Sequence, residues 1–317
     1  MHAVTIIDGA LEWHEHPDPV PGTGELLVEV RAAGLNGADM LQRIGLYPAP
    51  AGAPAAIPGL ELAGSVVATG DGVDRFAVGD RVMAVTGGGG QAELAIVSER
   101  HAIAVPPELD WAEAGGAPEV FSTAHDALFT QCGLTLGERV LVHGAAGGVG
   151  IAGVQLAAHA GAHVVATVRT PELRDRVAAI GEPCGVVEVC APDEHGARGP
   201  FDVVLELIGG PNLAGDVEHL ATGGRISIIG VGGGARAELD LLALMSRRGR
   251  IHGSTLRARS LEDKAAVARG FERSVLPLLA RGAVRVPIEA TVPMAEAAAA
   301  YDRFSAGAKL GKIVLVT

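Results

Sequence analysis

A glycine-rich segment between two hydrophobic stretches constrains the fold of this chain more than any other feature. It reads VLVHGAAGGVGIAGVQLA, with Gly144, Gly147 and Gly150 placed after an expected strand and at the start of an expected helix. A pyrophosphate group needs close approach to the backbone, together with the free N–H groups and positive dipole end of a helix N-terminus. This order favours a dinucleotide site over a glycine turn that only packs a helix on a sheet. The residues that we expect to hold the dinucleotide are Gly144, Ala145, Ala146, Gly147, Gly148, Val149 and Gly150.

The chain divides into two parts that differ in pattern. The first 110 residues read as short strands with many Gly and Pro turns, which is typical of a β-barrel-like domain. From about Ser122, apolar strands alternate with amphipathic helices, which indicates a doubly wound parallel sheet and an α/β fold. We therefore expect a barrel-like substrate domain at 1–120, a dinucleotide-binding domain at 121–257 and a return to the substrate domain at 258–317.

The expected elements of the second and third parts follow from hydrophobic periodicity. Thr170 is expected to cap a helix that begins at Pro171, where a missing N–H costs nothing. The other expected helices cover 149–160, 213–221, 261–281 and 294–306, and the expected strands cover 139–144, 163–168, 185–189, 201–210, 225–230 and 312–317, with a short strand near Ile251.

The bulk composition excludes several classes of partner. A formal charge of −12 opposes binding to nucleic acid or to an anionic membrane surface. No run approaches the roughly 18 apolar residues that a membrane helix needs. The first residues lack the basic start and apolar stretch of a signal peptide, and the three scattered cysteines are typical of buried thiols, so we expect a cytoplasmic protein.

The residues after the next expected strand bear on the choice of cofactor. Folds that prefer NAD place an acidic side chain roughly 20 residues beyond the glycine loop, on the ribose 2′-hydroxyl. This chain has Arg169 and Thr170 there, and a guanidinium can bind a 2′-phosphate that a carboxylate would repel. We therefore expect NADP (NADPH), held by Arg169, Thr170 and Arg174. The alternative is that Arg169 is a solvated residue at a strand end and that Arg174 lies on the outer face of the next helix.

The order of these parts resembles the medium-chain dehydrogenase/reductase superfamily, in which a GroES-like β-barrel precedes a Rossmann domain. The zinc-dependent alcohol dehydrogenases of that superfamily have a cysteine early in the barrel and a Gly-His-Glu segment later. Here AAGLNGAD places Asn36 at the cysteine position, and PGLELAG places Leu60 at the histidine position. The resemblance therefore implies a zinc-independent member. We expect no metal site, because three separated cysteines cannot form a structural zinc lobe and His14 and His16 are interpreted as solvated.

Within the zinc-free members, the chain is similar to NADPH:quinone oxidoreductases. The segments that carry this similarity are NGADMLQRIGLYP, PGLELAG, GGGGQAEL, HGAAGGVG, GSTLRARS and GKIVLV. LNGADMLQRIGLY, APEVFSTAHDALF and RRGRIHGSTLRAR are especially similar to the stress-inducible quinone reductase branch. The resemblance implies hydride transfer from NADPH to a small quinone or enone, and a homodimer. Related branches reduce enoyl thioesters, so an enoyl-thioester reductase and a non-catalytic NADPH-binding protein stay as alternatives.

The resemblance also assigns residues to the substrate pocket. It places Asn36, Asp39 and Tyr47 in the family's pocket segment. Asn36 could donate to a substrate oxygen, and Tyr47 could stack on a flat ring or donate its hydroxyl. Asp39 is expected to order the loop, because a free carboxylate would oppose a developing oxyanion. For each residue the alternative is a polar side chain that only structures the loop.

On the cofactor side, the resemblance places Thr123 beside the nicotinamide and phosphates, with an ordinary helix N-cap as the alternative. Gly230 and Val231 end an expected strand at the carboxyl edge of the sheet, where a ligand of a doubly wound fold lies. Glu206 is near that edge and is interpreted as structural. A basic run is interpreted as flanking a subunit contact or the cofactor phosphates, and it consists of Arg247, Arg248, Arg250, Arg257 and Arg259.

Overall fold

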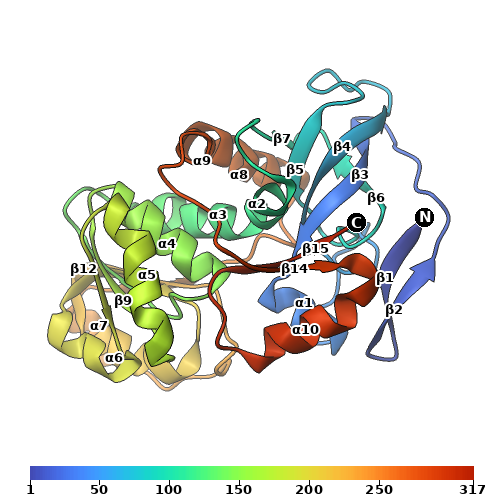
Figure 1. Cartoon of the computed structure of the whole chain (residues 1–317). Helices are drawn as coiled ribbons and strands as arrows, with labels where there is room; N and C mark the ends of the chain where they lie inside the picture. The colour runs from blue at the N-terminus through green and yellow to red at the C-terminus, as the bar shows by residue number, and fades with distance from the viewer. The chain divides into compact units, whose positions relative to one another are not determined.

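The computed structural model describes all 317 residues and forms two compact units (Figure 1). Unit 1 contains Met1–Ser122, Leu256–Gly307 and Lys312–Thr317, and unit 2 contains Thr123–Thr255 and Ala308–Gly311. The expected domain junctions lie after residues 120 and 257. The units therefore divide two residues away from each expected junction, and the short stretch 308–311 belongs to unit 2.

Unit 1 is built on a seven-stranded sheet in which the long strand β3 (Glu25–Gly34) is central. The strand order is β14-β15-β3-β4-β5-β7, and β6 also pairs with β3. Alternate residues of β3, namely Leu26, Val28 and Val30, are buried in one core, as the period of two in a strand requires. The other strands are β1 (His2–Ile7) and β2 (Ala10–Glu15), which form a separate hairpin, β4 (Glu61–Thr69), β5 (Arg81–Val85), β6 (Leu94–Ser98), β7 (Ile103–Ala104), β14 (Ile288–Pro293) and β15 (Lys312–Val316).

The helices of unit 1 follow the expected pattern with one break. The expected helical stretch 261–281 consists of α8 (Leu261–Ser274) and α9 (Leu276–Ala280). Pro277 lies in the first turn of α9 and has no N–H to continue the ladder of α8, which explains the break. The remaining helices are α1 (Gly37–Arg43), α2 (Trp111–Gly116) and α10 (Ala297–Ala306), and α3 (Pro118–His125) crosses the division between the units.

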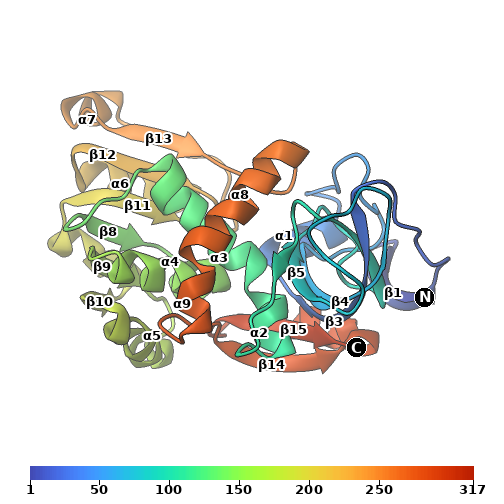
Figure 2. The same cartoon turned by 90° about the horizontal axis from the view of Figure 1, so that it is seen from above.

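Unit 2 is a six-stranded parallel sheet with the order β10-β9-β8-β11-β12-β13, and Figure 2 shows its strands side by side. Numbered from β8, this is the 3-2-1-4-5-6 order of a Rossmann fold, which confirms the expected fold class. The strands are β8 (Arg139–Val142), β9 (His163–Thr167), β10 (Val187–Cys190), β11 (Phe201–Glu206), β12 (Leu220–Ile228) and β13 (Arg250–Gly253).

Helices cover both faces of this sheet. Val140 and Val142 share a core with α4 (Gly148–His159) and α5 (Arg174–Gly181), whereas Leu141 between them shares a core with α6 (Gly210–Glu218) and α7 (Leu241–Ser246). Successive residues of a strand point to opposite faces, so one apolar run supplies both cores.

Several boundaries of unit 2 differ from the expected ones. Strand β11 ends at Glu206 instead of residue 210, and α6 covers Gly210–Glu218 instead of 213–221. Strand β12 begins at Leu220 instead of residue 225, and the chain from Pro171 forms a short 3₁₀ turn before α5. Thr170 does occupy the N-cap position, with Pro171 at the start of the turn, but its side chain accepts no capping hydrogen bond. Across the whole chain, no helix combines the length and the hydropathy of a membrane span.

Candidate cofactor and active site

The glycine loop of unit 2 connects β8 to α4. Gly144 has a φ of +64°, which favours glycine, and Gly147 is the N-cap residue of α4. A Cβ on Gly150 would lie 2.4 Å from the carbonyl oxygen of Gly144 and 2.7 Å from Cα of Ala145, so a larger residue cannot be accommodated without moving the loop. The first N–H groups of α4, from Gly148 onward, have no acceptor within the helix. The loop therefore has the close backbone approach and the free donors that a pyrophosphate requires.

The loop lies at the point where the strand order reverses. Strand β8 pairs with β9 on one side and with β11 on the other, and doubly wound folds bind ligands at the carboxyl ends of such strands. Gly230 follows β12 at the same edge, and a Cβ there would lie 2.2 Å from the carbonyl oxygen of Leu207. Val231 is 45% exposed. The expected cofactor residues at this edge are thus brought together within one unit.

The residues expected to select the nucleotide follow β9. Arg169 is exposed and Thr170 is partly buried. Arg174 is partly buried, and its Nε donates to the carbonyl oxygen of Val168 at 3.1 Å. Arg174 therefore braces the end of the strand, whereas the guanidinium of Arg169 is open to solvent.

Glu206 ends β11 and is completely buried. One of its carboxylate oxygens accepts from the N–H groups of Ile208 and Gly209, and the other accepts from Nδ2 of Asn212 at 3.1 Å. These contacts support the interpretation of Glu206 as a structural residue that shapes the turn after β11.

Unit 1 contains a buried polar cluster that joins Asn36, Glu61 and Lys312. Nζ of Lys312 lies 2.6 Å from Oε1 of Glu61 and donates to Oδ1 of Asn36 at 2.8 Å and to the carbonyl oxygen of Leu35 at 2.7 Å. The amide of Asn36 donates to Glu61 at 2.9 Å and to the carbonyl oxygen of Gly34 at 3.2 Å. Because these bonds occupy the donors of Asn36, its amide holds Lys312 and Glu61 in place, which favours the structural alternative over donation to a substrate oxygen.

Asp39 lies beside this cluster and is fully buried. Its carboxylate accepts from the N–H of Asn36 at 2.8 Å and from the N–H of Gly59 at 3.1 Å, so it orders the start of α1. Burial raises the pKa of Asp39 to about 7. Burial and the neighbouring Glu61 raise the pKa of Glu119 to about 8, and Oε2 of Glu119 is buried without a hydrogen-bond partner. Both carboxyl groups therefore hold a proton at mildly acidic pH.

Tyr47 is half-buried in the loop after α1 and is positioned by Arg257. The guanidinium of Arg257 lies 5.2 Å from the centre of the Tyr47 ring and donates to the Tyr47 carbonyl oxygen at 2.8 Å. It also donates to Oε1 of Gln42 at 2.5 Å and to the carbonyl oxygen of Gly87 at 2.8 Å. Burial raises the pKa of Tyr47, so its phenol stays protonated at neutral pH. Arg257 was expected to flank a subunit contact or the cofactor phosphates, but this side chain is only 2% exposed and its hydrogen bonds are made within unit 1.

The cluster bears on whether unit 1 could hold a catalytic zinc. The family resemblance places Asn36 and Leu60 where zinc-dependent members have cysteine and histidine, and Leu60 is a buried apolar residue. The adjacent carboxylate, Glu61, is paired with the ammonium of Lys312. An amide, an alkyl chain and an ammonium are not a zinc donor set, and the ammonium would repel a cation. These residues do not fit a zinc ion.

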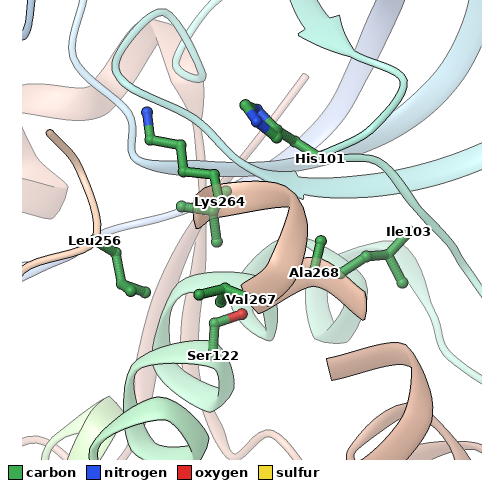
Figure 3. Close-up of a pocket in the computed structure, with 8 residues that line it drawn as sticks. His101, Ile103, Ser122, Leu256, Lys264, Val267 and Ala268 are labelled. Atoms are coloured by element: carbon green, nitrogen blue, oxygen red, sulfur yellow. The ribbon is translucent and has the colours of Figure 1, made fainter. Parts of the chain in front are cut away.

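Figure 3 shows a small pocket within unit 1 that none of the sequence expectations included. The hydroxyl of Ser122, which lines this pocket, is buried without a hydrogen-bond partner. Lys264 also lines the pocket, and burial lowers the pKa of its ammonium. The lining residues are Val85, His101, Ile103, Ser122, Leu256, Lys264, Val267 and Ala268.

Thr123, at the start of unit 2, lies inside α3 and is buried. An N-cap role is therefore wrong for Thr123, since α3 begins at Pro118. Glu61, Glu119 and Lys312 were not among the expected site residues. Glu61 lies within PGLELAG and Lys312 lies within GKIVLV, two segments on which the family resemblance is based. Their position in these segments is the sequence feature that could have identified them as site residues.

A GroES-like unit and a Rossmann unit with an intact glycine loop define the class of medium-chain dehydrogenases/reductases. Two family models match the chain: the alcohol dehydrogenase GroES-like domain over residues 22–107 and the zinc-binding dehydrogenase over residues 185–315. The term zinc-binding is part of the description of the second family model. In this chain, the residues around Asn36, Leu60 and Lys312 do not fit a zinc ion.

Similar proteins narrow this class. The chain is 31% identical to a quinone oxidoreductase of Rattus norvegicus over 94% of its length and 91% of that protein. It is also 31% identical to a quinone oxidoreductase of Pseudomonas aeruginosa over 96% of its length and 95% of that protein. It is 36% identical to the spectinabilin polyketide synthase system protein NorB of Streptomyces orinoci over 92% of its length, but it spans only 13% of that protein.

Solved structures agree with these relatives. The quinone oxidoreductase of Thermus thermophilus, solved alone and with NADPH, superposes with a TM-score of 0.85 at 32% identity, with each chain fully covered. A mycobacterial protein complexed with NADPH superposes with a TM-score of 0.86 at 27% identity, again with full coverage. The chain belongs to the quinone oxidoreductase family of the medium-chain dehydrogenase/reductase superfamily, and it is an oxidoreductase.

Proposed function

We propose that this protein is a zinc-independent reductase that uses NADPH to reduce a quinone or another conjugated carbonyl compound. The observation that carries the proposal is the Lys312–Glu61–Asn36 cluster, because the Lys312 ammonium neutralises the one carboxylate there and would repel a metal cation. The quinone oxidoreductase relatives support the acceptor class, and the NADPH complexes among the similar structures support NADP(H).

The cofactor supplies a hydride when it is bound, and the chain's own residues bind and orient the reactants. The N–H groups at the start of α4 bind the pyrophosphate, and Arg169 binds the 2′-phosphate through its guanidinium. Arg257 fixes Tyr47 through the carbonyl group, which leaves the phenol hydroxyl available to an acceptor oxygen. A protonated phenol can donate to an oxygen as negative charge develops on it. Asn36 and Asp39 act indirectly, because they hold the segment that carries Tyr47.

An acceptor panel tests this proposal. NADPH oxidation is followed at equal concentrations of a simple quinone, an enone and a saturated aldehyde, with NADH in parallel and with a chelator present or absent. We expect turnover with the quinone and the enone, weaker turnover with NADH and no effect of the chelator. Loss of activity on chelation, or reduction of the saturated aldehyde alone, would contradict the proposal. Tight NADPH binding without turnover of any acceptor would instead indicate the non-catalytic NADPH-binding protein.

A second candidate is an enoyl-thioester reductase. It is favoured by the matches to segments of polyketide synthases, including the erythronolide synthase EryA2 of Saccharopolyspora erythraea at 36% identity over 92% of this chain and 8% of that protein. A crotonyl thioester added to the same panel separates the two candidates. A value of kcat/KM for the thioester at least tenfold above that for the quinone would select the second candidate.

We further propose that the protein is a cytoplasmic homodimer. Strand β13 is an edge strand of the unit 2 sheet, and its unpaired edge can accept a strand of a second copy. The neighbouring helix α7 exposes Leu241, Leu242 and Met245 at 65%, 73% and 71%. We expect Leu242→Glu to shift sedimentation from dimer to monomer, whereas wild-type protein that sediments as a monomer would contradict this assembly.

A further inference from the structure

A cluster of metal-ligating side chains in unit 2 has no part in the proposed reaction. His143 follows β8, His195 lies in a short 3₁₀ segment (Pro192–Arg198), and Asp216 lies in α6. One ligand atom from each residue lies within 4.8 Å of the other two. His143 and Asp216 are 1% and 0% exposed, and the ring of His143 meets the ring of His195 edge-on at 5.1 Å. Three separate elements therefore direct two imidazoles and a carboxylate to one place.

The protonation of His195 follows from its neighbours. Its Nδ1 lies 2.6 Å from the carbonyl oxygen of Pro192, which can only accept, so Nδ1 carries the proton of the neutral ring. Nε2 then presents a lone pair, and this atom is buried without a hydrogen-bond partner. Oδ2 of Asp216 is a second buried acceptor without a partner. A buried acceptor without a partner destabilises the fold. A cation or a hydrogen-bond donor placed between these two acceptors would remove that cost.

Hydrogen bonds also fix the ring of His143 within this cluster. Its Nε2 lies 2.8 Å from Oδ1 of Asp216, and its Nδ1 lies 3.0 Å from the hydroxyl of Thr167. A hydroxyl can donate or accept, so Thr167 supports either tautomer of the ring. Such a bond to the outer ring nitrogen is typical of histidines that bind metals. Glu206, also completely buried, adds a second carboxylate 3.8 Å from Nε2 of His143.

We propose that His143, His195 and Asp216 form a binding site for a divalent transition-metal ion of the zinc class. Two imidazole nitrogens and a carboxylate suit Zn²⁺ and Co²⁺, with water as a fourth ligand, whereas Mg²⁺ and Ca²⁺ prefer oxygen ligands. Ligand atoms around a tetrahedral zinc lie roughly 3.3 Å apart, given bonds of about 2.0 Å. His195 must therefore move inward by up to about 1.5 Å, from a separation of at most 4.8 Å. It is the ligand on the short outer segment, whereas His143 and Asp216 are already in contact.

The bound ion would have a structural role. It would tie the 3₁₀ segment that contains His195 to α6 and to His143, the residue before the first glycine of the cofactor loop. This site lies in the Rossmann unit and is built from residues different from those at the zinc-ligand positions of unit 1. It is therefore compatible with hydride transfer that does not use zinc.

The test is metal binding by the full-length protein after treatment with a chelator and dialysis. Co²⁺ is titrated while the visible absorption of tetrahedral cobalt is recorded, and Zn²⁺ is then added as a competitor. We expect one Co²⁺ per chain, displacement by Zn²⁺, and affinity at least tenfold weaker in His195→Ala and Asp216→Asn. His14→Ala, which changes an exposed histidine in unit 1, is the matched control and should bind as the wild type does.

A second measurement separates loss of binding from loss of folding. Circular dichroism and NADPH binding should be unchanged in His195→Ala, and Zn²⁺ should raise the Tm of the wild type but not of this variant. The proposal is overturned if no saturable binding is seen. It is also overturned if His195→Ala, Asp216→Asn and His14→Ala all bind Co²⁺ as the wild type does, since the binding would then be adventitious.

Discussion

Replacing Lys312 with methionine tests the buried polar cluster directly. The Lys312 ammonium is 2% exposed, contacts Glu61 at 2.6 Å and makes two further hydrogen bonds, so its removal leaves a carboxylate that is 0% exposed without its counter-ion. Breaking a buried ion pair by removing one partner costs about 3–5 kcal/mol. We expect the free energy of unfolding of unit 1 to fall by that amount in Lys312→Met.

Urea unfolding followed by tryptophan fluorescence measures this loss in the correct unit. Trp13 and Trp111 are the two tryptophans of the chain, and both lie in unit 1. Arg303→Met, which removes an exposed ion pair with Glu289 in the same unit, is the control and should cost about 1 kcal/mol or less. Glu61→Gln removes the uncompensated charge and keeps a polar group there, so the double variant should recover about 2 kcal/mol relative to Lys312→Met.

Two results would refute this reasoning. Equal losses in Lys312→Met and Arg303→Met would mean that the Lys312 ammonium is not a buried partner of Glu61. Additive losses in the double variant would mean that Glu61 and Lys312 are not coupled.

Three further predictions concern the cofactor loop and the buried acid. Arg169→Ala should weaken NADPH binding by about 1–3 kcal/mol and leave NADH unchanged, as judged by the two dissociation constants, and equal losses would remove Arg169 from the 2′-phosphate. Gly150→Ala places a Cβ 2.4 Å from the Gly144 oxygen and should weaken NADPH binding at least tenfold, whereas Gly215→Ala, where a Cβ meets nothing within 4 Å, should not. Burial raises the pKa of Asp39 from 3.8 to about 7, so the stability due to its protonated form is complete below about pH 4 and is lost as the pH rises through 7. Asp39→Asn should flatten this fall in a series of urea midpoints, and an unchanged slope would show that another group causes it.

The dinucleotide loop could be predicted from the sequence because all of its parts are contiguous. One strand, three glycines and one helix follow each other within VLVHGAAGGVGIAGVQLA, and local pattern is sufficient to identify them. The Rossmann class was predictable for the same reason, since strand and helix alternate along the chain. The substrate class depended on family resemblance, because nothing local defines the shape of an acceptor.

The polar cluster of unit 1 could not be predicted in this way. Lys312 and Asn36 are 276 residues apart, and only the pairing of β15 with β3 brings them together. Arg257 was misinterpreted for a related reason: it was grouped with the basic neighbours Arg247, Arg248 and Arg250, and the whole run was expected to flank a subunit contact or the cofactor phosphates. Arg257 is buried because it donates to three acceptors on segments far away in the sequence. The charge of its sequence neighbours does not reveal those contacts.

The position of β15 in the sheet of unit 1 also has a consequence for the order of synthesis. Residues 123–255 of unit 2 are continuous, so most of that unit can fold while the ribosome is still translating the rest of the chain. Unit 1 cannot complete its fold until the C-terminus is translated, because β15 supplies the strand between β14 and β3 and the ammonium that neutralises Glu61. Until residues 312–316 emerge, the barrel strands retain an open edge and an unpaired buried acid. The nascent barrel is therefore open to misfolding and aggregation until the end of translation.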